Sequence, residues 1–162
     1  MIRWLLRLSV LSLGLTAALS GYIRLVPNDP ALWHLDPAAA GFAPAAHWAV
    51  FCPGADSRYA MTPIIPAEIL ARFEAVALAS KRTQRFAGSL EQGRITWITR
   101  SALIGYPDFT TLGFRAFPSG LQPCLIARQH FGDFDWGVNE ARLSGWVQSA
   151  FGLLEPPPRV WN

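Results

Sequence analysis

The sequence predicts an α+β fold: an antiparallel meander sheet of four to five strands with two amphipathic helices packed on one face, preceded by an N-terminal membrane helix. The chain has 162 residues, enough for one domain with appendages. It is 51% hydrophobic and only 15% charged, so a core or a membrane must take up a large apolar surface. Four short β-type runs follow one another at hairpin-like spacing, with a helical apolar stripe before and after them.

The first element is an apolar segment over residues 1–24. Its uncharged run from Leu8 to Ile23 is 16 residues long, between the apolar core of a signal peptide, about 7 to 15 residues, and a membrane span of about 17 to 25. Trp4 and Tyr22 bracket the segment as interfacial aromatic residues do, so we predict an uncleaved signal anchor. Two alternatives stay open: signal cleavage before Gly21, and a buried core helix.

Charge predicts the orientation of this segment. Arg3 and Arg7 precede the apolar run and only Arg24 follows it, so the positive-inside rule predicts a single-pass inner-membrane protein whose C-terminal domain is periplasmic. Leaving out Arg3 and Arg7 reduces the 14 basic residues to 12, against 11 acidic residues. This balance, without a basic patch, excludes nucleic acid as a partner.

Residues 25–56 form a collar rich in proline and alanine, which predicts short turns rather than long elements. Asp29 and Asp36 each precede a proline, and this pattern predicts brief helical turns at "DPALWH" and "DPAAAG".

The α+β domain is predicted over residues 57–154, followed by a proline-rich tail over 155–162. A further short strand is considered at residues 59–61, and the "PAEILARFEAVALA" stripe predicts a helix over 66–79 with Glu68 and Arg72 on its solvent side. The predicted meander strands cover residues 83–90, 94–101, 109–117 and 121–129. A last helix is predicted from about Asp135, and its stripe is expected to bury Trp136, Leu143, Trp146 and Phe151.

Cys52 and Cys124 match no metal-binding or thioredoxin-type spacing. We predict two separate thiols, with a disulfide as the alternative. The three histidines are not spaced as ligand pairs, and the usual catalytic signatures are absent, so we predict no metal, no cofactor and no catalytic residue.

Three stretches, "YIRLVPNDPALWH", "RSALIGYPDF" and "ARQHFGDFDWGVNEAR", together resemble the domain of unknown function 1499 family of bacterial and plastid proteins. The resemblance spans most of residues 22–151. The matching residues are Arg100, Ser101, Pro107, Asp108, Arg128, Gly132, Asp135, Gly137, Val138, Asn139 and Arg142. The chain departs from the family at Ala127 and Gln129, where serines are usual, and at His130, where a second arginine is usual. The resemblance implies an N-terminal membrane segment and no assigned activity.

The candidate ligand-binding or structural polar cluster is Arg100, Asp108, Arg128, His130, Asp133, Asp135, Asn139 and Arg142. Strand periodicity puts Arg128 on the same face as Cys124 and His130. We expect Arg128 to meet an aspartate at the start of the last helix and to hold that helix on the sheet.

The predicted function is that of a membrane-tethered extracytoplasmic domain, non-enzymatic, which binds a small apolar or anionic ligand, lipid included, or an envelope partner. The alternative is an envelope enzyme that uses the Arg/Asp/His group as its site.

Overall fold

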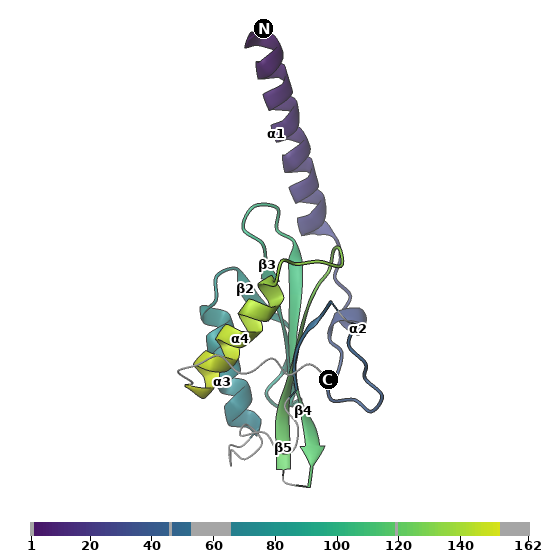
Figure 1. The fold of residues 1–162 in the computed structure, drawn as a ribbon, viewed down its shortest axis with the longest axis vertical. Coiled ribbons are helices and arrows are strands. Elements are labelled where there is room, and N and C mark those ends of the chain that lie inside the picture. The colour runs from purple at the N-terminus through teal and green to yellow at the C-terminus, as the bar shows by residue number, and fades with distance from the viewer. Residues whose placement is uncertain (1, 46, 53–65, 119, 153–162) are drawn as a thin grey trace.

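The computed structural model of the chain describes residues 2–45, 47–52, 66–118 and 120–152 (Figure 1). The elements in chain order are α1 (Ile2–Leu25), α2 (Pro30–Trp33), β1 (Ala49–Phe51), α3 (Pro66–Ala79), β2 (Thr83–Ser89), β3 (Arg94–Arg100), β4 (Pro107–Phe117), β5 (Gly120–Gln129) and α4 (Val138–Phe151).

The predicted α+β meander is confirmed. All strand pairs are antiparallel, and the order in the sheet is β1-β5-β4-β3-β2. The sequence did not predict β1, which adds a fifth strand beside β5 through the pairing of Val50 with Ile126. The strand considered at residues 59–61 lies outside the described residues.

Helices α3 and α4 both cover one face of the sheet, as predicted (Figure 1). The core between helices and sheet includes Phe73 of α3, Trp97 of β3 and Trp146 of α4, all buried. The indole rings of Trp97 and Trp146 meet edge to face, and their N–H groups donate to Glu74 and Ser80. Both tryptophans are therefore buried with their polar atoms satisfied.

The start of α4 differs from the prediction at Trp136, which is 86% exposed rather than buried. Trp136 and Gly137 both have a left-handed backbone, with φ of 56° and 75°, so the helix cannot include them and begins at Val138. Leu143 and Trp146 are buried as expected, and Phe151 is partly buried against the core.

The described collar residues that precede β1 cover the other face of the sheet. Asp29 caps α2 by accepting a hydrogen bond from the backbone N–H of Ala31, as the "DPALWH" pattern predicts. The "DPAAAG" segment forms hydrogen-bonded turns, and the Asp36 carboxylate accepts the N–H of Ala38 at their start in the same way. Trp33 stacks on Phe109 of β4 at 4.3 Å between ring centroids. The collar is thus a packed layer of the domain.

Cys52 and Cys124 form a disulfide, so the prediction of two free thiols is wrong. The pairing of Phe51 with Leu125 places the next residue of the β1 segment opposite Cys124. The disulfide therefore links the end of β1 to the neighbouring strand β5 at the edge of the sheet, an arrangement that depends on the unpredicted β1.

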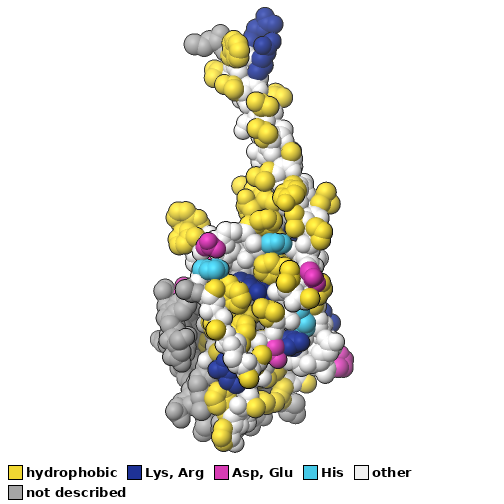
Figure 2. All heavy atoms as spheres, turned by 90° about the vertical axis from the view of Figure 1, so that its right-hand side faces the viewer, with side chains coloured by type: hydrophobic (Ala, Val, Ile, Leu, Met, Phe, Trp, Pro, Cys, Tyr) yellow, Lys and Arg dark blue, Asp and Glu magenta, His cyan; other side chains and the backbone are white. Residues whose placement is uncertain are grey.

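Helix α1 extends away from the domain (Figure 1). It is the one helix in the described part of the chain that is long and apolar enough to cross a membrane, and its apolar window is 0% buried. Figure 2 shows hydrophobic side chains along α1 and gathered where it meets the domain. A buried core helix, one of the alternatives, is therefore not what the structure shows.

Candidate functional site

The sheet separates the predicted polar cluster into two groups. Cα partners in an antiparallel sheet present their side chains on the same face, and neighbours along a strand on opposite faces. Asp108 pairs with Gln129 and Phe109 pairs with Arg128, so Asp108 and Arg128 point to opposite faces. The prediction that Arg128 contacts an aspartate at the start of the last helix is wrong, because α4 packs on the face of the sheet to which Asp108 points.

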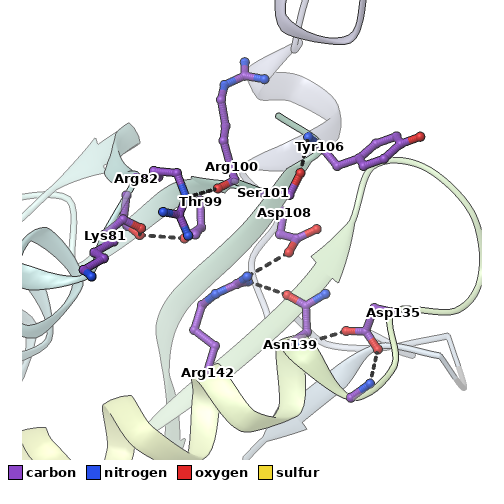
Figure 3. Close-up of polar contacts among 12 residues, drawn as sticks. Lys81, Arg82, Thr99, Arg100, Ser101, Tyr106, Asp108, Asp135, Asn139 and Arg142 are labelled. Carbon is purple, nitrogen blue, oxygen red and sulfur yellow. Dashed lines mark hydrogen bonds and ion pairs between the residues drawn. The ribbon is translucent and has the colours of Figure 1, made fainter. Parts of the chain in front are cut away.

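A network of four predicted residues joins α4 to the sheet (Figure 3). Arg142 pairs with Asp108 at 2.8 Å and donates a second hydrogen bond to the Asn139 amide oxygen at 2.6 Å. Asp135 accepts the backbone N–H groups of Gly137 and Asn139 at 2.9 and 2.7 Å, which fixes the turn before the helix. These contacts join α4 to β4, with the strand supplying the aspartate and the helix the arginine.

The Asp108–Arg142 pair is largely removed from water, with side chains 15% and 11% exposed. Burial raises the pKa of Asp108, while the hydrogen bond and charge of Arg142 act in the opposite direction and Asp135 adds a smaller increase. The carboxylate therefore depends on Arg142 to stay ionised in this position.

Arg128 holds the collar on the opposite face. Its guanidinium lies between the rings of Trp33 and Trp48, at 4.6 and 4.7 Å from their centroids, and donates to the backbone carbonyl of Leu32 at 2.7 Å. Burial lowers the pKa of Arg128 to about 10, so it stays a cation at neutral pH. Two aromatic faces and a carbonyl take the place of a carboxylate as its partners.

His130 belongs to the same collar face. Its Nδ1 lies 3.0 Å from the Asn28 amide oxygen, and its ring stacks on Phe131 at 4.4 Å. Burial, and then the charge of Arg100, lowers the pKa of His130, so the ring is held neutral. Its contacts in the described structure include none of the predicted aspartates, so the acid–base group that the alternative of an envelope enzyme requires is not assembled there.

Arg100 lies at the end of β3, next to α1. Its guanidinium donates to the Gly105 carbonyl at 3.0 Å. Burial and the nearby charge of Arg24 lower its pKa. Ser101 follows and accepts the N–H groups of Gly105 and Tyr106, which closes the loop between β3 and β4 (Figure 3). Arg100 is thus a loop-forming residue near the end of α1.

Asp133 lines an open cleft of about 440 Å³ between the collar and the start of α4. The cleft is lined by His47, Trp48, Ala49, Asp133, Phe134, Asp135, Gly137 and Glu140. Three carboxylates, the rings of Trp48 and Phe134 and the imidazole of His47 give it a surface that suits an apolar group with a positive charge and repels an anion. Among the described residues, no group of three His, Cys, Asp or Glu side chains is placed to hold a metal ion.

Sequence reasoning missed the collar residues of these sites, mainly Trp33, His34 and Trp48. His34 bonds to Thr96 at 2.7 Å and accepts from Arg94 at 3.2 Å, and burial lowers its pKa. The available signal was the presence of several aromatic residues in a segment otherwise rich in proline and alanine, since such residues seek a packing surface.

Comparisons of the chain with protein-family models, with curated proteins and with solved structures found no match.

Proposed function

We propose that this chain is a single-span membrane protein whose α+β domain lies on the extracytoplasmic side of the inner membrane and works by binding rather than by catalysis. The observation that carries the proposal is α1, a helix of 24 residues whose apolar window has no part buried against the domain. An exposed apolar surface of this size suits a helix that is surrounded by lipid.

Two independent features support the extracytoplasmic side. Arg3 and Arg7 lie at the end of α1 distant from the domain, so the positive-inside rule assigns that end to the cytoplasm. The Cys52–Cys124 disulfide is typical of an oxidising compartment such as the periplasm.

A binding role is supported by how the polar residues are used. Arg128, Arg142 and Arg100 all bond to the protein itself, which leaves little basis for an anion site built from them. The cleft beside Asp133 suits a small, largely apolar ligand with a cationic group instead. The alternative of an envelope enzyme needs the Arg/Asp/His group in one place, whereas the sheet lies between its members.

Membership of the domain of unknown function 1499 family stays a proposal. Its support is the motif itself, together with the fact that the matched residues Asp108, Asp135, Asn139 and Arg142 lie in one hydrogen-bonded network.

The test of the anchor uses cells that express the full chain. After alkaline carbonate extraction we expect the protein in the membrane fraction, and in spheroplasts we expect added protease to digest the domain. Release by carbonate would contradict the anchor, and protection from protease would contradict the orientation.

The test of the cleft is native mass spectrometry of the full-length protein released from detergent. We expect a co-purifying small ligand that the parent retains and Asp133→Lys loses, because the substitution reverses a charge at the cleft. Glu91→Lys is the matched control, since Glu91 is also exposed but lies in the turn between β2 and β3. A ligand lost equally from both variants, or from neither, would contradict the cleft as its site.

A further inference from the structure

The domain carries its most exposed apolar side chains on two loops. Leu103 lies between β3 and β4, and Phe134 and Trp136 lie between β5 and α4; they are 87%, 72% and 86% exposed. No other large hydrophobic side chain beyond α1 in the described structure exceeds 64%. Tyr106 and Val138, in or next to the same loops, are 38% and 51% exposed. We call these five residues the apolar rim.

Both loops lie at the end of the sheet next to α1 (Figure 1). β4 begins where the first loop ends and β5 ends where the second begins, and Asp108 and Gln129 pair at this edge. The rings of Tyr106 and Phe131 meet at 5.7 Å between centroids, so the loops contact each other. The rim residues therefore lie on two loops that touch at this end of the sheet.

The end of α1 is fixed to the first loop. Ser20 donates to the Ile104 carbonyl at 3.0 Å, and the Arg24 side chain lies so close over Gly105 that an added Cβ would approach its carbon atoms within 2.8–2.9 Å. Ile23 is buried at this junction. The domain is therefore not joined to α1 by a flexible linker, and its first loop has a fixed position relative to the helix.

The length of α1 indicates how deep the first loop would lie in a bilayer. At about 1.5 Å per residue, the roughly 20 residues from Trp4 to Ile23 match a hydrocarbon core of about 30 Å when the Arg7 side chain snorkels back to the headgroups. Ser20 then lies roughly 5 Å below the outer boundary of that core, since it precedes Ile23 by about one turn. Ile104, bonded to Ser20, and the adjacent Leu103 are consequently placed close to this boundary, where the hydrocarbon core meets the lipid interface.

We propose that the apolar rim inserts into the interfacial region of the bilayer that holds α1, so that the domain rests on the membrane surface. This inference rests on the proposed anchor. Tryptophan and tyrosine are the residues that favour the interface, since the ring is apolar and one atom stays polar. Arg24, exposed beside the rim, reaches lipid phosphates from this position, whereas Asp133 faces the cleft.

The backbone at Trp136 holds its side chain outward. A tryptophan at φ of 56° occupies a conformation that costs energy, and the bonds of Asp135 to Gly137 and Asn139 maintain the turn. The Trp136 ring contacts Phe134 at 5.0 Å, edge to face, rather than packing into the core. A bilayer gives these two rings the apolar surroundings that the domain does not.

The test places a nitroxide label on single introduced cysteines in the full-length protein, reconstituted into phosphatidylcholine–phosphatidylglycerol vesicles. The native cysteines do not react without a reductant, because they form a disulfide. Leu103→Cys and Trp136→Cys report on the rim, one from each loop. Leu121→Cys is the matched control, since Leu121 is also exposed but lies in the β4–β5 hairpin at the opposite end of the sheet.

We expect the labels at positions 103 and 136 to show a several-fold higher ratio of collisions with oxygen to collisions with a water-soluble nickel complex than the label at 121. Equal ratios at all three positions would overturn the inference. Exclusion of both reagents from the rim labels would overturn it too, because that result indicates a protein contact. A fourth label, from Leu13→Cys in α1, separates the two proposals: if it lies in lipid while the rim labels lie in water, the anchor stands and only the rim insertion fails.

Discussion

Removal of Arg142 should destabilise the protein strongly, because it leaves the Asp108 carboxylate buried without its cation. Breaking a buried ion pair by removing one partner typically costs about 3 to 5 kcal/mol, against a total stability of about 5 to 15 kcal/mol. The pair here fits that class, with an N–O distance of 2.8 Å and both side chains less than one-sixth exposed. For Arg142→Met, which keeps much of the apolar stem, we expect the melting temperature to fall by about 10 °C or more.

The loss should also depend on pH, and its sign follows from Asp108. Burial already raises the pKa of Asp108 while Arg142 is present, so removal of Arg142 raises it further. A carboxyl whose pKa is higher in the folded than in the unfolded state destabilises the folded protein least below the unfolded pKa of about 3.9. Its penalty grows as pH rises through the folded pKa. The difference between Arg142→Met and the parent should therefore be larger at about pH 8 than at about pH 4.5.

The measurement is thermal unfolding of the full-length protein in detergent across this pH range. Arg72→Met is the matched control, because Arg72 pairs with Glu68 at 2.7 Å but both side chains are about half exposed, and such pairs contribute about 0.3 to 0.5 kcal/mol. In the double variant Asp108→Asn/Arg142→Met, the pH-dependent part of the loss of stability should disappear. An Arg142→Met protein that melts like Arg72→Met, or whose deficit is constant with pH, would refute this reasoning.

The other stability predictions concern the disulfide and the collar. Cys52→Ser/Cys124→Ser should lower the free energy of unfolding by about 2 to 4 kcal/mol, and thiol labelling of the denatured, non-reduced parent should find no free thiol; a labelled thiol would contradict the bridge. Arg128→Ala should lower stability by about 2 to 5 kcal/mol, because two cation–π contacts are lost and the Leu32 carbonyl loses its donor. The same unfolding assay checks it, and a melt unchanged from the parent would mean that Arg128 does not hold the collar. Arg115→Ala is its control, since Arg115 lies on the same sheet in β4, less deeply placed than Arg128.

The sequence predicted the long elements well because their signals are local. The stripe over 66–79 and the four β-type runs match α3 and the meander to within a few residues. It missed β1 because a strand of three residues is too short to show periodicity. The error on the cysteines follows from that omission, since Cys52 comes opposite Cys124 through the pairing of β1 with β5.

The site was predicted less well because its geometry depends on strand register. Periodicity along β5 correctly placed Arg128 and Cys124 on one face of the sheet. It carries no information about which residues of β4 point to that same face. A register shift of one residue would have put Asp108 on the face of Arg128 instead. The residues of the polar cluster could thus be identified from their types, whereas their partners could not.

The concentration of polar side chains in this charge-poor chain is explained by where they lie. Apolar burial stabilises a layer of structure without fixing its direction, while a hydrogen bond requires two atoms in a set orientation. Three connections at the α1 end of the sheet need such direction: α1 to the first loop through Ser20, the collar to β5 through Arg128, and α4 to β4 through Arg142. A helix leaving a membrane can orient a domain only if these joints are rigid. The polar cluster therefore has a mechanical reason to lie beside the proposed anchor, and this reason does not depend on the ligand proposed for the cleft.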